Sequence, residues 1–270
     1  MSAPFGTVAI VGAGQAGTML GLALRSGGGA REITVFDRDP DVARRSVARG
    51  AAHRVTERLA LDADVVVLAL PVSAIVEVLA RHAADFRTGS LVIDTGTAKA
   101  RVVAAMRELP AGIHAIGGHP LAGTERRGPE GADPAALAGA PFALCPVRDD
   151  AEALRLAERL VRAAGARPLV IGAGEHDRIV ARTSALPHLL AFALARCAAR
   201  AGDVTPLAAS GYAGATRLAR SDPGMVASFL AANGDETRAA VSDLRGALDD
   251  LVASLDDERA LAAKLAEIAP

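Results

Sequence analysis

The sequence predicts an α/β fold in two parts, a parallel sheet covered by helices and then an all-helical segment. Three observations predict it. An apolar run, 8–11, leads into a glycine-rich turn, and short apolar runs then alternate with helical periodicity as far as residue 171. No strand pattern follows Gly174. Alternation of this kind is typical of βαβ units. We therefore expect one domain over 1–172 and a helical domain over 173–270.

The glycine-rich turn has the spacing G-x-G-x-x-G at Gly12, Gly14 and Gly17. The first glycine permits a tight bend, the second permits a pyrophosphate to approach the backbone, and the third permits close helix–strand packing. A helix pattern begins at once, so the backbone at Gln15 and Ala16 is expected to face phosphate groups. The spacing therefore predicts a dinucleotide site in a Rossmann-type domain.

An acidic residue in the expected place strengthens this prediction. The apolar run 33–36 ends at Asp37, 20 residues after Gly17, where a carboxylate would accept hydrogen bonds from the adenosine ribose. Such a carboxylate favours NAD and repels the 2′-phosphate of NADP, although Arg38 beside it leaves NADP possible. Leu70 and Pro71 end the next central run and are expected at the same edge. We expect NAD as cofactor.

The remaining pattern completes both parts. Further strands are expected at 64–70, 90–94, 113–116, 142–145 and 168–171. Helices are expected at 18–24, 41–50, 72–86, 98–109, 151–164, 179–200, 205–220, 225–233 and 236–265. The segment 117–141 is rich in Gly and Pro and too long for an ordinary connection, which indicates a functional loop.

Composition excludes several classes of protein. The net charge of −1 argues against a nucleic-acid-binding protein. The two cysteines, Cys145 and Cys197, form neither a disulfide framework nor a metal set, and both are expected to be buried thiols. We expect no signal peptide, because the N-terminus has no basic stretch and its apolar run belongs to the first strand. No uncharged stretch is long enough to span a membrane, so we expect a cytoplasmic protein without a membrane partner.

Polar residues that follow strands are the candidates for chemistry, because ligands bind beyond the carboxyl ends of the strands in open α/β sheets. Two such groups are 94–99 and 117–125, and the helical part adds 176–188. These blocks read D-T-G-T-A-K, G-G-H-P-L-A-G-T-E and H-D followed by S-A-L-P-H, and T-R-L-A-R-S-D-P stands at 216–223.

Together these blocks resemble the prephenate/arogenate dehydrogenase family over nearly the whole chain. The resemblance implies a Rossmann domain with a helical dimerisation domain, and hence a homodimer. It also implies oxidative decarboxylation of a cyclohexadiene carboxylate with a nicotinamide dinucleotide as oxidant. The neutral imidazole of His119 would withdraw the proton of the ring hydroxyl.

The resemblance implies roles for further residues, each with a plainer alternative. Thr97 replaces the usual serine and could hydrogen-bond both substrate and His119. Arg217 is the candidate carboxylate clamp, although an arginine on an exposed helix is the alternative. His188 would contact the substrate side chain with Ser184 nearby, or be a hydrogen-bonded histidine between helices.

Lys99 and Glu125 could shape the pocket or be solvated surface charges. His176 and Asp177 are expected to open the first helix of the second domain, with Asp177 as a possible N-terminal cap.

Three departures from the family pattern bear on the substrate. Ala185 replaces a histidine, Gly214 stands where some members carry an acid, and with the chain stopping at Pro270 we expect no appended regulatory domain. The substrate remains open between prephenate, arogenate and 4-amino-4-deoxyprephenate. A 3-hydroxyacid dehydrogenase would need a catalytic lysine that 179–200 lacks. A dinucleotide-binding regulator without turnover is the alternative from another class.

Overall fold

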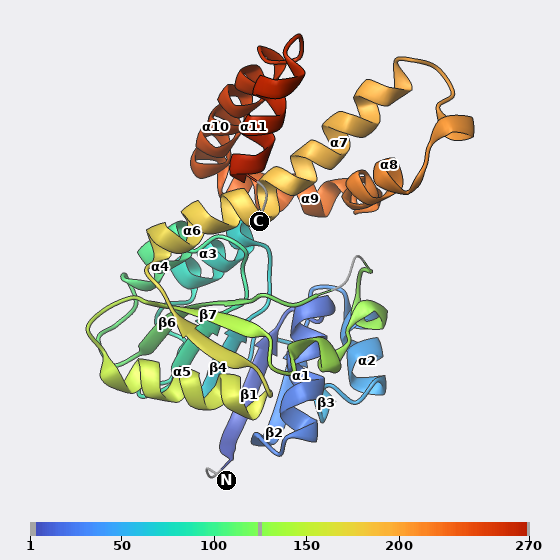
Figure 1. The fold of residues 1–270 in the computed structure, drawn as a ribbon. Helices are drawn as coiled ribbons and strands as arrows, with labels where there is room; N and C mark the ends of the chain where they lie inside the picture. Colours follow the sequence, from blue (N-terminus) through green and yellow to red (C-terminus); the bar gives the residue numbers. More distant parts are fainter. Residues whose placement is uncertain (1–3, 124–125, 269–270) are drawn as a thin grey trace.

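A computed structural model describes residues 4–123 and 126–268, and it confirms an α/β part followed by a helical part (Figure 1). The strands are β1 Phe5–Val11, β2 Ala30–Phe36, β3 Arg54–Val55, β4 Val65–Leu68, β5 Leu91–Asp94, β6 His114–Pro120, β7 Pro141–Pro146 and β8 Arg167–Val170. They form one sheet in the order β3-β2-β1-β4-β5-β6-β7-β8. The chain moves outward from β1 in both directions, so the edge between β1 and β4 is a topological switch point.

Eleven α-helices fall within the described residues. In the sheet part they are α1 Gln15–Ser26, α2 Pro40–Ala48, α3 Val72–Arg81, α4 Ala100–Met106 and α5 Ala151–Ala163. In the helical part they are α6 Ala173–Val180, α7 Leu186–Ala199, α8 Ser210–Ala215, α9 Pro223–Ala232, α10 Gly234–Val252 and α11 Glu258–Ile268. Because β8 ends at Val170 and α6 begins at Ala173, we keep 172/173 as the proposed boundary.

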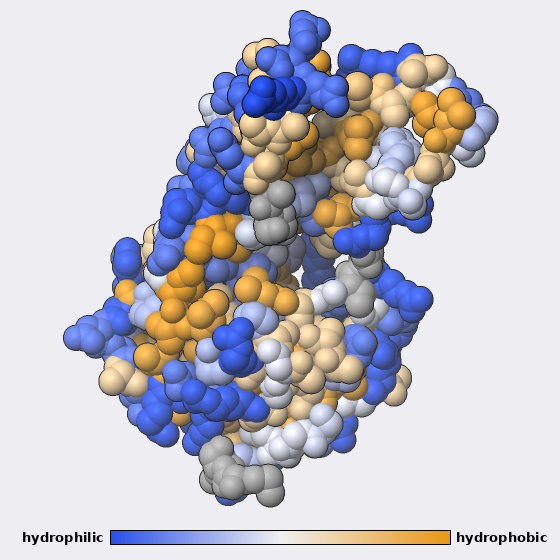
Figure 2. Space-filling model, in the orientation of Figure 1, coloured by the Kyte–Doolittle hydropathy of each residue, from blue (hydrophilic) through white to orange (hydrophobic). Residues whose placement is uncertain are grey.

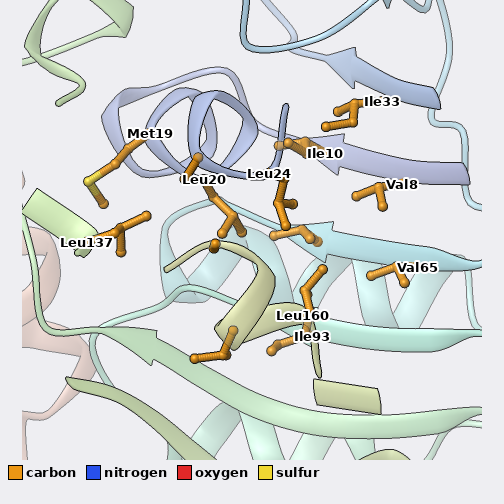
Figure 3. Packing of buried hydrophobic residues seen from close by; sticks show 14 of the residues in the cluster. Val8, Ile10, Met19, Leu20, Leu24, Ile33, Val65, Ile93, Leu137 and Leu160 are labelled. Atoms are coloured by element: carbon orange, nitrogen blue, oxygen red, sulfur yellow. The ribbon is translucent and has the colours of Figure 1, made fainter. Parts of the chain in front are cut away.

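The central strands read as continuous apolar runs because both faces of the sheet are covered. On β1, Val8 and Ile10 face a core that α1 and α5 cover, whereas Ala9 and Val11 face the core of α3 and α4. Figure 3 shows the first core, where Leu24 of α1 points toward β1 and β4 and Met19 lies beside Leu137. Helix packing on both faces is what buries all four residues of β4.

One pair of strands departs from the predicted parallel sheet. β6 and β7 are antiparallel, although β7 and β8 are again parallel. β6 also runs four residues beyond the apolar run at 113–116, so His119 lies on a strand and not in a loop. The strand period was hidden there because Gly117 and Gly118 carry no side chain. β3, with two residues, was not predicted at all.

The helical part differs more from the prediction. The helix expected at 179–200 begins already at Ala173 and contains a π-helical turn, Ala181–Ala185. That turn stands immediately before α7, whose second residue is Pro187, which has no N–H for the regular ladder. The helix expected at 205–220 is only α8 with short 3₁₀ turns on either side. The one expected at 236–265 is two helices, and Asp257 caps the second through the N–H of Ala260 (2.9 Å).

The helical part has a thin core. Within described residues 173–268, the buried apolar side chains are Val180, Ala181, Ala185, Ala191, Val226 and Ala240. Apolar side chains lie exposed on this part instead, and Figure 2 shows them between the α10–α11 pair and α7. None of the described helices combines the length and apolar character needed to cross a membrane.

The glycine-rich turn joins β1 to α1 with very little space. Gly12 has φ +103°, and a Cβ there would lie 2.2 Å from the carbonyl oxygen of Ala69. A Cβ on Gly17 would lie 2.0 Å from the carbonyl oxygen of Gly12. Gly14 is different, because a Cβ there would meet nothing within 4 Å. Two of the glycines therefore serve packing, while the third faces open space.

This difference predicts opposite outcomes for two alanine substitutions. Gly17→Ala forces backbone atoms apart, which costs about 1–3 kcal/mol and outweighs the better helix propensity of alanine. Gly14→Ala, the matched control, has room and an extended backbone, so it should change stability by less than about 0.5 kcal/mol. Urea denaturation of both variants measures the free energy of unfolding. Equal stability of the two variants would contradict the packing role of Gly17.

Candidate active site

The dinucleotide-type turn lies at the switch point of the sheet. Asp37, directly after β2, is tied to this turn because its carboxylate accepts hydrogen bonds from the N–H of Ala13 (2.8 Å) and of Asp39 (3.0 Å). It is half-buried and follows a strand that pairs with β1, whereas Arg38 beside it is exposed. A fixed carboxylate beside an open Gly14 fits the adenosine ribose and pyrophosphate of a dinucleotide.

The other predicted cofactor residues surround the same turn. The side chain of Leu70 lies against Gly12, and Pro71 begins α3 as its N-cap residue. Ala16 lies in the first turn of α1, where no side chain caps the helix. The side-chain amide of Gln15 points away from the helix and donates to the carbonyls of Arg126 (2.6 Å) and Gly131 (3.3 Å). Gln15 therefore holds the β6–β7 connection beside the turn.

His119 is held at the carboxyl end of β6. It pairs with Ala143 of β7, and the preceding Gly118 is so close to β5 that a Cβ would lie 2.3 Å from the carbonyl oxygen of Asp94. The antiparallel β6–β7 pair thus anchors the backbone of His119 from one side and β5 from the other. His119 itself is half-buried.

A fully buried ion pair lies beneath His119. The ammonium of Lys99 contacts the carboxylate of Asp94 and donates to the carbonyl of Gly118 (2.6 Å). The same carboxylate accepts from the N–H of Gly96 (2.7 Å) and of Gly118 (2.9 Å). Both side chains are 0% exposed. This corrects the expectation for Lys99, which neither lines a pocket nor lies on the surface, because its donors serve Asp94 and the end of β6.

The ring of His119 is hydrogen-bonded to a second histidine. Its Nδ1 lies 2.9 Å from Nε2 of His176, and Nδ1 of His176 lies 2.8 Å from Oδ1 of Asp177. The two rings meet edge to face, with centroids 5.1 Å apart. Thr97 is half-buried, and the described residues show no hydrogen bond between Thr97 and His119. The hydrogen bond of Thr97 with His119 is therefore not formed among the described residues, and a contact of Thr97 with substrate stays a prediction.

The surroundings of His119 favour the neutral imidazole. Burial, the positive charge of Lys99 and the neighbouring His176 together hold the pKa of His119 well below its ordinary value. Burial alone would raise the pKa of Asp177, but hydrogen bonds from His176, Ala100 and Lys99 lower it on balance. A neutral imidazole and an ionised carboxylate therefore coexist at the ends of the same hydrogen-bonded chain.

Asp177 has a structural task that differs from the predicted one. It lies inside α6, which begins at Ala173 after Gly172, so it does not cap its own helix. Its carboxylate accepts instead from the N–H of Lys99 (2.7 Å) and of Ala100 (2.8 Å) and so caps α4 in the sheet part. The sequence showed the His-Asp pair, but only the fold shows which helix it caps and that His176 faces His119.

The remaining histidine of interest lies on α7. Nδ1 of His188 donates to the carbonyl of Ser184 (2.9 Å), and its ring meets Phe229 edge to face at 5.0 Å. The plainer alternative, a hydrogen-bonded histidine between helices, describes these contacts. Ser184 lies in the π-helical turn, a feature that often marks functional sites. A substrate contact through Nε2 of His188 stays a prediction.

Arg217 lies exposed on the 3₁₀ turn Arg217–Arg220, which packs against α7. Five residues later, Asp222 forms an ion pair with Arg127 of the β6–β7 connection. This ion pair, which the sequence did not reveal, joins the connection that follows His119 to the segment of Arg217. Glu125 lies outside the described residues.

The two cysteines take no part in the site. Cys145 is buried on β7, and burial raises the pKa of its thiol to about 12. Cys197 is exposed on α7, which corrects the expectation of a buried thiol, because that face of α7 is uncovered in the single chain. Among the described residues no cluster of His, Cys, Asp or Glu could hold a metal ion.

Comparison with known proteins matches both parts of the chain. The family model described as "Prephenate dehydrogenase, nucleotide-binding domain" matches residues 20–170, and "Prephenate dehydrogenase, dimerization domain" matches residues 172–268. The prephenate dehydrogenase of Lactococcus lactis is 30% identical over 253 residues, covering 90% of this chain and 70% of that protein. The cyclohexadienyl dehydrogenase of Zymomonas mobilis is 29% identical over 229 residues, covering 81% and 78%.

A solved structure agrees with this match. Prephenate dehydrogenase from Aquifex aeolicus, in complex with hydroxyphenyl propionate and NAD⁺, superposes with a TM-score of 0.91 at 26% identity. The superposition covers 99% of this chain and 97% of that one. On these grounds the chain belongs to the prephenate dehydrogenase family.

Proposed function

We propose that the protein is an NAD-dependent dehydrogenase that oxidatively decarboxylates a cyclohexadiene carboxylate, prephenate or arogenate. The observation that carries the proposal is the hydrogen-bonded, half-buried His119 at the same sheet edge as the glycine-rich turn. The names of the related enzymes, which include a cyclohexadienyl dehydrogenase, support the same class of substrate. The cytoplasmic location stays a prediction from the sequence.

The cofactor residues fit NAD. Gly14 and the first turn of α1 would hold the pyrophosphate, and Asp37 would hold the ribose hydroxyls. NAD, when bound, supplies the acceptor for the hydride that leaves C4 of the substrate ring. The carboxylate of Asp37 disfavours the extra phosphate of NADP, so we propose NAD as the preferred cofactor.

The protein's own chemical contribution is a proton transfer by His119. As hydride leaves C4, the neutral imidazole accepts the proton of the C4 hydroxyl, and the carbon becomes a carbonyl instead of a cation. Cleavage of the bond between C1 and the carboxylate then sends its electron pair through the ring to that carbonyl oxygen. The oxygen takes the proton back from His119, which leaves an aromatic phenol and CO₂.

The substrate carboxylate needs a cation. We propose Arg217 for this role because guanidinium binds carboxylate in a bidentate fork. The Arg127–Asp222 ion pair keeps the segment of Arg217 beside the connection that follows His119. Thr97, His188 and Ser184 remain proposed substrate contacts on the surrounding elements.

A second copy of the chain is the proposed partner. The thin core of the helical part leaves Leu190 and Leu194 on α7 about two-fifths exposed, and Leu207 is 92% exposed. Exposed apolar surface of this kind is usual in obligate dimers. The family model for this part is described as a dimerization domain, which supports a homodimer.

The substrate is tested by direct assay. Purified protein is incubated with NAD or NADP and each of prephenate, arogenate and 4-amino-4-deoxyprephenate, and formation of NADH or NADPH is followed at equal concentrations. We expect turnover with prephenate or arogenate and faster turnover with NAD. Binding of NADH without turnover of any of the three would contradict the proposed function and favour a regulator.

Replacement of His119 tests the proton acceptor. His119→Asn should bind NADH as the parent does but lose at least about a hundredfold in kcat. Because only the neutral imidazole accepts a proton, kcat/KM of the parent should fall as the pH drops through the lowered pKa of His119. That acid limb should lie below about pH 6.5, the ordinary value for histidine, with a plateau above it. An acid limb above this pH, or a fully active variant, would contradict the assignment.

Charged substitutions on α7 test dimer formation. The parent should sediment as a dimer, and Leu190→Arg combined with Leu194→Arg should yield monomers, because two buried charges cost several kcal/mol. Val170→Arg, at a similarly exposed valine of β8, is the control and should leave the dimer intact. Sedimentation equilibrium measures the masses. A monomeric parent would overturn the proposed dimer.

A further inference from the structure

Three side chains lie in one hydrogen-bonded row that ends at the proposed base. From Asp177 the row runs through His176 to His119, with contacts of 2.8 Å and 2.9 Å. Asp177 and His176 are buried, with 4% and 2% of their surface exposed. The row crosses from α6 in the helical part to β6 in the sheet.

The chemistry of each member fixes the direction of the row. An ionised carboxylate can only accept, so Nδ1 of His176 must carry the proton in their shared bond. A neutral His176 then has its lone pair on Nε2, and this lone pair must accept from Nδ1–H of His119. His119 is thereby left with a lone pair on Nε2, the nitrogen that none of its described neighbours occupies.

We infer that Asp177 and His176 are positioning residues that hold His119 in the one neutral tautomer able to accept a proton at Nε2. This inference rests on the proposed function, in which His119 accepts the hydroxyl proton of the substrate. Without the row, His119 could carry its proton on Nε2 and present a donor where an acceptor is needed. The role resembles the general logic of a base oriented by a third group.

The row can also stabilise the positive charge that His119 gains when it accepts the substrate proton. Protonated His119 donates Nδ1–H to His176, and a shift of that one proton to Nε2 of His176 leaves the positive charge beside the carboxylate of Asp177. The reverse shift restores protonated His119, whose Nε2–H then passes to the phenolate oxygen, so no proton is gained or lost. This arrangement counters Lys99, whose charge opposes a cation on His119.

Helix capping alone does not explain His176. Asp177 needs only its two bonds from the N–H of Lys99 and Ala100 to cap α4. A capping aspartate is also paired with a histidine at the start of α5, where Nδ1 of His114 lies 2.8 Å from Asp150. No third ring follows His114 among the described contacts. His114 is therefore a matched control for the same local pairing outside the site.

The tautomers are measured directly on the full-length protein. Histidine is labelled with ¹⁵N, and spectra are recorded at a pH above the ordinary imidazole pKa of about 6.5. The signals of each ring are assigned with variants in which one histidine at a time is replaced. Long-range ¹H–¹⁵N correlation shows which nitrogen carries the proton. We expect Nδ1–H on both His119 and His176. Nε2–H on neutral His119 would overturn the inference, and this outcome does not depend on any substrate being turned over.

Steady-state kinetics distinguish a positioning role of His176 from a purely structural role. His176→Phe, which keeps a ring but no acceptor, should lower kcat about 10–100-fold with KM and NADH affinity within about twofold of the parent. His176→Gln, whose amide oxygen can accept from Nδ1–H, should recover part of the loss. His114→Phe should leave kcat unchanged.

Other outcomes overturn the inference. A His176→Phe variant with the kcat of the parent would overturn it. A variant that loses NADH affinity and kcat equally would also overturn it, because such a loss indicates a structural role for His176. If the parent itself turns over none of the three cyclohexadiene acids, the proposed function fails. The tautomer measurement then still decides whether Asp177 and His176 set the state of His119.

Discussion

The site depends on the carboxylate of Asp177, which joins three parts of the molecule. It caps α4 at the edge of the sheet, it belongs to α6 of the helical part, and it holds His176 against His119. The side chain of Asn233 adds a bond to the carbonyl of the same residue (2.7 Å) and ties in the start of α10. Because all of these contacts meet at Asp177 and its neighbour His176, the helical part and the ring of His119 are linked through one short segment of α6.

A second constraint lies directly below. The Lys99–Asp94 pair supplies hydrogen-bond partners to backbone groups at the ends of β5 and β6. These are the N–H groups of Gly96 and Gly118 and the carbonyl of Gly118, which would otherwise be buried without partners. Breaking such a pair leaves an uncompensated buried charge, which costs about 3–5 kcal/mol. Together with burial, the charge of the same ammonium lowers the pKa of His119. One buried cation thus supports the strand that carries His119 and tunes its protonation.

The sequence could predict what depends on local pattern. The glycine turn, Asp37 and the central strands follow from backbone sterics and from burial on both faces, and the structure has them where the pattern places them. The end of β6 could not be predicted, because Gly117 and Gly118 pair with β7 through the backbone alone. Nor could the burial of Lys99, since the sequence does not reveal that Asp94 and Gly118 enclose it.

The least predictable contacts are those between the two parts, and these matter most for the proposed chemistry. His119 and His176 are 57 residues apart, and Arg127 and Asp222 pair over a still longer separation. Neither pair has a periodic signal, because each depends on how α6 and the β6–β7 connection dock. With so few buried apolar residues of its own, the helical part cannot fix that docking by packing alone. The polar contacts His119–His176 and Arg127–Asp222 are then what fix α6 and the β6–β7 connection relative to each other.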